Sequence, residues 1–183
     1  MVFPAKENNV LELFFNEPTK HWHFNEIVRK AGISEQRANH WLKQFVKKGL
    51  IKRVKPKEKM PYFIANYEHP VYENKKRLYG LNKMFETGLL TKLQSLKKAK
   101  TIVIFGSFAR GDWNTQSDVD VFIYGDDENF GFETYWKSFG RTIQIHAFKS
   151  RRDIKKIRSG LINNVINGYF VKGSVHDIVE VKA

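Results

Sequence analysis

The feature that most constrains this 183-residue chain is an apolar run that ends in a glycine-serine turn and precedes two alternating aspartates. Residues Thr101–Phe105 are typical of a buried strand, and Gly106 and Ser107 predict a tight turn into a short helix. A second strand is expected to carry Asp118 and Asp120. Because successive side chains of a strand point to opposite faces, both carboxylates are expected on one face.

This arrangement indicates a particular chemistry. Two carboxylates that point into one space repel each other unless a cation lies between them, and hard oxygen ligands beside a phosphate suit magnesium. Glycine at position 106 lets a ligand approach the backbone, and the amides that open the following helix offer donors to an anion. The segment 101–121 therefore predicts a nucleotide phosphate held beside a metal ion.

Three pieces of this segment together resemble a family signature: Gly106-Ser107, Arg110-Gly111 and Ser117-Asp118-x-Asp120. They are similar to the DNA polymerase beta-type nucleotidyltransferases, and most of all to the small, minimal branch. The resemblance implies transfer of a nucleoside monophosphate from a nucleoside triphosphate to a hydroxyl, with Mg²⁺ or Mn²⁺ as cofactor. It implies that Asp118 and Asp120 hold the metal. The implied nucleotide-binding residues are Gly106, Ser107, Arg110 and Ser117.

The chain departs from this family at the third carboxylate, which members supply from a later strand. The matching strand is expected over 141–148, where Gln144 and His146 share one face. Gln144 is the better positional match for a catalytic role, yet its neutral amide is a weaker magnesium ligand and cannot act as a base. The alternatives for the missing acid are His146, Asp126, Asp127 and Asp153. Phe108 stands where the family often has another arginine.

The first third of the chain has a different pattern. Apolar periodicity and capping residues predict helices at 5–16, 25–31 and 34–48, an extended segment at 21–24, and strands at 50–54 and 62–66. This order resembles the winged helix-turn-helix, in which the second helix of the pair enters the major groove of DNA. The resemblance implies contacts with duplex DNA by Gln36, Arg37, Asn39, His40 and Lys43 on the helix, and by Lys55, Lys57 and Lys59 on the wing.

The predicted architecture is therefore an α+β protein of two domains. Residues 1–67 are expected to form the winged helix-turn-helix domain, and residues 68–183 the nucleotidyltransferase domain on a mixed sheet. A linker helix is expected over 71–86. The remaining predicted elements are helices at 89–96, 129–139, 151–158 and 161–167, and a final strand at 175–181.

Charge and composition agree with a partner that is a polyanion. The formal net charge is +13 and the sequence pI is about 9.8, which favours nucleic acid, although a lysine-rich solvated surface gives the same balance. Residues 1–67 hold 13 Lys and Arg against 6 Asp and Glu, so the charge is densest in the expected DNA-binding domain. The absence of cysteine excludes disulfides and thiolate sites. No segment is apolar enough to span a membrane, and we expect a cytoplasmic protein.

Three functions remain open at this point. The first is a nucleotidyltransferase tethered to a DNA-binding domain. The second is a DNA-binding transcriptional regulator whose degenerate transferase domain binds nucleotide as a signal or forms a homodimer. The third follows from the resemblance alone: minimal nucleotidyltransferases often act as antitoxins that modify a partner protein, so the acceptor hydroxyl would belong to a protein tyrosine.

Overall fold

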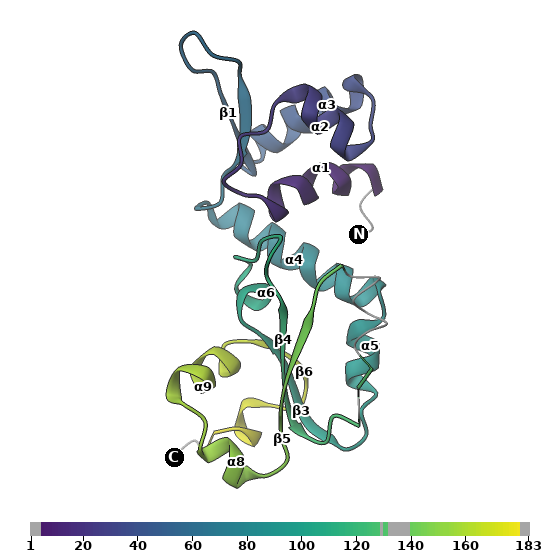
Figure 1. The fold of residues 1–183 in the computed structure, drawn as a ribbon, viewed down its shortest axis with the longest axis vertical. Helices are drawn as coiled ribbons and strands as arrows, with labels where there is room; N and C mark the ends of the chain where they lie inside the picture. The colour runs from purple at the N-terminus through teal and green to yellow at the C-terminus, as the bar shows by residue number, and fades with distance from the viewer. Residues whose placement is uncertain (1–4, 129, 132–139, 180–183) are drawn as a thin grey trace. The chain divides into compact units, whose positions relative to one another are not determined.

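The computed structural model describes residues 5–128, 130–131 and 140–179 (Figure 1). The chain forms two compact units. Unit 1 comprises Met1–Lys76 with Trp113–Thr115, and unit 2 comprises Arg77–Asp112 with Gln116–Ala183. The division falls inside helix α4 (Pro70–Glu86), whereas the sequence pattern suggested a division before this helix.

Unit 1 consists of helices and a β-hairpin, in the predicted order. Helix α2 ends at Gly32 in the left-handed conformation, and the Ser34 hydroxyl caps α3 by accepting a hydrogen bond from the Arg37 amide. The apolar faces of the helices meet in a core that includes Phe14, Ile27 and Leu42. The elements are α1 (Ala5–Asn16), α2 (Phe24–Ala31), α3 (Glu35–Lys47), β1 (Ile51–Val54) and β2 (Tyr62–Ala65).

Trp22, which lies just before α2, pairs with strand β2 of the hairpin. Strands β1 and β2 pair antiparallel, with Ile51 opposite Ala65. Trp22 and Phe63 exchange two backbone hydrogen bonds of 2.8 Å, which explains the extended segment that the sequence predicts before α2. Figure 1 shows the loop of this hairpin extending away from the three helices of unit 1.

Unit 1 also contains three residues from far along the chain. Trp113 is 2% exposed, and its ring lies edge-on to Phe15 with 6.1 Å between ring centroids. The Lys76 ammonium lies 4.6 Å from the centroid of the same indole, and the Thr115 amide donates to the Asn16 carbonyl at 2.9 Å. The segment Trp113–Thr115 is thus part of the core of unit 1.

Unit 2 is built on a mixed four-stranded sheet in the order β5-β4-β3-β6. Strand β3 is antiparallel to both of its neighbours, and β4 is parallel to β5. Its elements are α5 (Leu89–Gln94), β3 (Ala99–Phe105), α6 (Ser107–Arg110), β4 (Val119–Gly125), β5 (Ile143–Phe148), α8 (Arg151–Lys155), α9 (Ser159–Ile166), β6 (Tyr169–Lys172) and a 3₁₀ helix (Val175–Asp177).

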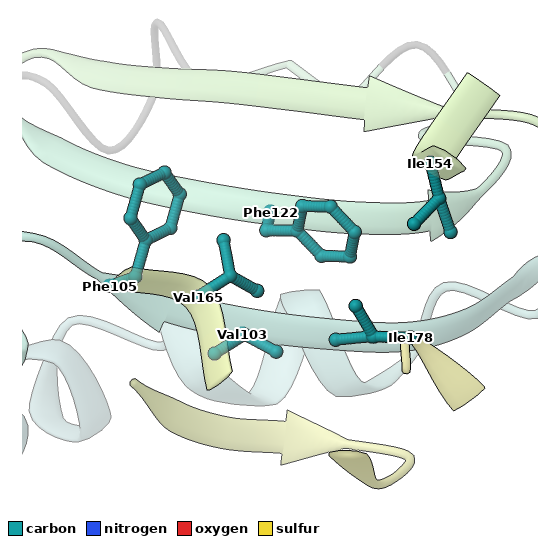
Figure 2. Close-up of a cluster of buried hydrophobic side chains, with 6 residues drawn as sticks. All are labelled: Val103, Phe105, Phe122, Ile154, Val165 and Ile178. Atoms are coloured by element: carbon teal, nitrogen blue, oxygen red, sulfur yellow. The ribbon is translucent and has the colours of Figure 1, made fainter. Parts of the chain in front are cut away.

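One face of this sheet carries a cluster of buried apolar side chains. Figure 2 shows side chains from β3, β4, α8, α9 and the C-terminal segment meeting over the sheet. Phe122 follows Asp120 by two residues on β4, so both side chains belong to the same face. The candidate metal ligand is therefore placed at the end of a rigid apolar cluster. The cluster is Val103, Phe105, Phe122, Ile154, Val165 and Ile178.

The C-terminal segment differs from its prediction. The expected strand at 175–181 is wrong at its start, where a 3₁₀ helix forms instead, because Asp177 is held in place by hydrogen bonds. Its carboxylate accepts from the Thr101 hydroxyl at 2.9 Å and pairs with the Lys100 ammonium at 2.8 Å. The Lys100 interaction, followed by the Ser174 amide, lowers the pKa of Asp177 to about 2.

Two further observations complete the fold. The predicted helix at 129–139 lies largely outside the described residues, which include only Phe130 and Gly131 of that range. Within the described part of the chain, every helix is too short or too polar to cross a lipid bilayer.

Candidate active site

The turn after β3 is the most constrained point of the site. Gly106 has φ 72° and ψ −147°, a conformation that residues with a side chain avoid. A Cβ placed on Gly106 would also collide with the carboxylate of Asp120. The strand pairing accounts for this contact, because Phe105 lies opposite Asp120 in the β3–β4 register. The predicted turn and the predicted carboxylate are therefore adjacent.

Asp120 lies in an environment that disfavours its negative charge. Its side chain is 25% exposed. Burial raises the pKa of this carboxyl and the nearby Asp118 adds to the effect, while His146 and Arg110 act in the opposite direction. Asp118 itself is exposed and lies one residue before β4, so the expectation that both aspartates belong to the strand is wrong for Asp118. The strand begins only where β4 starts to pair with its neighbours, at Val119.

This pair of carboxylates fits a divalent cation. A positive ion would offset both the burial of Asp120 and its repulsion by Asp118. Magnesium in nucleotide enzymes is commonly held by one or two carboxylates together with substrate phosphates. Among the described residues, no group of three or more His, Cys, Asp or Glu is arranged to hold a metal. The donor set is thus the two aspartates, without a third acidic ligand.

The β4–β5 register places Gln144 directly opposite Asp120 on the neighbouring strand. Gln144 is exposed, and its amide lies where a third ligand from β5 would be expected. The alternative acids are placed elsewhere. Asp126 follows the far end of β4, about 20 Å from Asp120 along the strand, and Asp127 comes after it. Asp153 belongs to the capping box of α8, where it bonds to Ser150.

His146 approaches Asp120 more closely than the strand pattern alone indicates. Its Nε2 atom lies 3.5 Å from Oδ1 of Asp120, a distance longer than a good hydrogen bond. Nε2 is buried, and within the described part of the chain it has no hydrogen-bond partner. The ring of Phe105 packs against the imidazole, with 5.3 Å between ring centroids. His146 is thus the second β5 side chain that faces the aspartates.

The phosphate-binding candidates lie around the one-turn helix α6. Ser107 begins this helix, which spans only four residues, so its dipole is much smaller than that of a full helix. Arg110 ends it, with an exposed side chain whose Nε lies 3.0 Å from Asp112 Oδ2. The Ser117 carbonyl accepts a hydrogen bond from Arg141 Nη1 at 3.2 Å.

Arg141 was not identified from the sequence. Its guanidinium carbon lies 5.5 Å from the centroid of the Phe108 ring, in a cation–π arrangement. Phe108 stands where the resembling family often has an arginine, and the structure brings the Arg141 guanidinium onto its ring. The two positions are 33 residues apart. The only sequence signal was an arginine just before β5, which is too common a pattern to indicate a site.

The predicted DNA-contacting residues all lie in unit 1, and all are exposed. Gln36, Arg37, Asn39, His40 and Lys43 are on α3, whereas Lys55, Lys57 and Lys59 are in the loop between β1 and β2. The structure thus presents the two predicted groups to solvent on the two elements that the resemblance implied.

Residues 87–166 match the family described as "Nucleotidyltransferase domain". This segment, less than half of the chain, is similar to nucleotidyltransferase domains. It runs from just before α5 to the end of α9, and so includes the glycine turn, both aspartates, Gln144 and Arg141. The predicted resemblance to nucleotidyltransferases is confirmed for the domain, whereas the roles of Gly106, Asp118 and Asp120 stay predictions.

The matches to individual proteins are also partial. A protein of Methanocaldococcus jannaschii, named "Putative protein adenylyltransferase MJ0604", is 52% identical over 29 residues, which are 16% of this chain and 29% of that protein. The structure described as "Crystal structure of the toxin-antitoxin with AMP-PNP" is 18% identical with a TM-score of 0.35, covering 52% of this chain and 75% of the other. A mutant of the toxin-antitoxin MntA-HpeT has 16% identity, the same TM-score and the same coverage.

Proposed function

We propose that unit 2 transfers a nucleoside monophosphate from a nucleoside triphosphate to a hydroxyl group of a protein acceptor, and that pyrophosphate is released. The observation that carries this proposal is the adjacency of the Gly106 turn and the Asp120 carboxylate within a segment similar to nucleotidyltransferase domains. A side chain at position 106 would occupy the space in which a phosphate and its metal ion meet the carboxylate. Glycine keeps that space open.

Each residue of the site has a defined part in this proposal. Asp118 and Asp120 hold Mg²⁺ or Mn²⁺, which would neutralise charge on the phosphate oxygens during transfer. Arg110 and Arg141 add positive charge beside the same turn, and their planar guanidinium groups suit phosphate oxygens. Gln144 lies opposite Asp120 on β5, where its amide oxygen could contact a cation but could not accept the proton of the attacking hydroxyl. We therefore expect slow transfer.

The protein acceptor is supported by the name of the Methanocaldococcus jannaschii relative, which specifies protein adenylylation. The same name favours ATP as the donor. Because the shared stretch is 29 residues, the support concerns the transferase site rather than a particular partner.

The decisive experiment combines binding and transfer on the full-length protein. Calorimetry with ATP and Mn²⁺ should show saturable binding by the wild type, and labelled ATP should mark a protein acceptor when candidate proteins are added. The double variant Asp118→Asn, Asp120→Asn should lose most of the metal-dependent affinity, because neutral amides do not compensate the ion. Asp126→Asn, at the other end of β4, is the matched control. Absence of nucleotide binding by the wild type in the presence of metal would refute the proposal.

A second function is favoured by the surface of unit 1. We propose that α3 and the β1–β2 loop bind duplex DNA, supported by the eight exposed polar and basic side chains on those two elements. If the protein binds ATP and DNA but transfers nothing to any acceptor, the regulator hypothesis takes precedence over the enzyme.

A further inference from the structure

Unit 1 contains a cavity of about 440 Å³ between α3 and the β-hairpin. Its apolar lining comes from three places: the start of α2, one face of α3, and the hairpin. Pockets of this volume are typical of small-molecule sites rather than of packing defects. The apolar lining residues are Phe24, Leu42, Val46, Pro61 and Phe63.

The polar lining of the same cavity is basic. Asn39 and Lys43 contribute from α3, and Arg53 contributes from β1. Asn39, Lys43 and Val46 follow each other at spacings of four and three, so they share one face of the helix. Within the part of the chain that the structure describes, the side chains of Lys43 and Arg53 have no ion-pair or hydrogen-bond partner, and no Asp or Glu lines the cavity.

We propose that this cavity binds a small apolar anion, namely an aromatic carboxylate of one or two rings. The apolar lining would remove the rings from water, which is favourable in proportion to the area buried. The carboxylate would lie between Lys43 and Arg53, with the Asn39 amide as a further donor. A free phosphate would leave the apolar part of the cavity uncovered, and a neutral hydrocarbon would gain no charge-assisted contact with Lys43 or Arg53.

If α3 binds DNA as proposed, a ligand in this cavity would compete with the duplex. Asn39 and Lys43 belong to the α3 surface that we assign to the duplex. An anion held between Lys43 and Arg53 neutralises positive charge on that surface and covers part of it. The aromatic carboxylate and the duplex therefore exclude each other, and the ligand acts as an effector that releases DNA.

The first experiment measures binding to the full-length protein without DNA. Titration calorimetry with 1-naphthoate should show saturable binding of one molecule per chain. Its neutral analogue 1-naphthamide has the same rings and should bind at least about tenfold more weakly, which corresponds to about 1.4 kcal/mol. Equal affinity for the two compounds, or no saturable binding of naphthoate up to its solubility, would overturn the proposal.

Matched variants test the location of the site. Arg53→Glu should reduce naphthoate affinity by at least about tenfold, whereas Lys52→Glu makes the same charge change on the opposite face of β1 and should have little effect. Val46→Trp should block the cavity, and it is tolerable because Val46 is 39% exposed. Circular dichroism of each variant confirms folding. Equal losses in Arg53→Glu and Lys52→Glu would show a general charge effect and refute the site.

A third experiment tests whether the ligand releases DNA. In a fluorescence assay with labelled duplex, naphthoate should displace DNA from the wild type but not from Val46→Trp. If naphthoate binds in calorimetry and leaves DNA binding unchanged, the site stands and its effector role is wrong. If the wild type binds no duplex at all, the proposed DNA function fails, while the calorimetry still decides whether the cavity binds aromatic carboxylates.

Discussion

The candidate site of unit 2 depends on backbone geometry, whereas that of unit 1 depends on exposed side chains. In unit 2, the site depends on backbone geometry: the conformation of Gly106 and the strand register bring the turn and Asp120 into contact. In unit 1, the candidate DNA-contacting side chains project into solvent from a helix whose other face is buried. A site of the first kind has few tolerated substitutions, whereas one of the second kind depends on total charge and on a few exposed groups.

The largest effect is expected at Gly106. Gly106→Ala forces a side chain into a strained conformation, which costs about 1–3 kcal/mol, and places its Cβ against Asp120. We expect nucleotide binding in calorimetry to fall below detection, together with a lower melting temperature. Gly160→Ala in α9 is the control, because its Cβ would meet no neighbouring atom. If Gly106→Ala bound ATP like the wild type, backbone geometry would not define the site.

The next largest effect is expected at Gln144, which lies opposite Asp120 on the neighbouring strand. Gln144→Asp supplies an anionic oxygen at the third position, and we expect the rate of labelled nucleotide transfer to rise about tenfold or more, equivalent to about 1.4 kcal/mol of transition-state stabilisation. The equivalent change at a remote exposed position, Gln94→Asp, should leave the rate unchanged. Robust wild-type transfer that is insensitive to Gln144→Asp and abolished in His146→Ala would assign the role to His146 instead.

A smaller effect is expected from the wing. Replacing Lys55, Lys57 and Lys59 together by Ala should weaken binding of all duplex sequences, and should lower the slope of log K against log salt by about 2.7, at about 0.9 per phosphate contact. Replacing Lys92, Lys97 and Lys98 in unit 2 by Ala changes the net charge equally. If both triple variants flatten the salt dependence alike, then net charge rather than the wing carries the binding.

The smallest effect concerns the stability of unit 2. The folded-state pKa of Asp177 is about 2, below the value of about 3.9 for an unfolded chain. Its stabilising contribution is therefore fully present above about pH 4 and is lost as the pH falls toward 2. We expect Asp177→Asn to lower the free energy of unfolding by about 1 kcal/mol at pH 7, with the difference from wild type narrowing below pH 4. Urea titrations at several pH values measure this, and a constant difference would contradict it.

The sequence predicted those features of the fold that depend on local geometry. The turn at Gly106, the face shared by Gln144 and His146, and the cap at Ser34 follow from glycine conformation, strand alternation and capping chemistry. Arg141 was missed because it reaches Phe108 only through tertiary packing. The approach of His146 to Asp120 depends on a side-chain orientation that strand alternation does not specify. The turn at Val175–Asp177 has a local capping box of Ser174 and Asp177, and Asp177 also accepts a hydrogen bond from distant Thr101, which the sequence does not indicate.

The membership of Trp113–Thr115 in unit 1 bears on how such a protein can change over generations. Recombination usually exchanges contiguous stretches of a gene, and a crossover after residue 76 would carry away a tryptophan that belongs to the core of unit 1. The same three residues lie between Arg110 and Asp118. The loop must therefore both fill the core of unit 1 and connect two parts of the candidate site of unit 2. A single crossover therefore cannot separate the two units intact. A substitution at Trp113 changes the interior of unit 1 at a position inside the motif of unit 2.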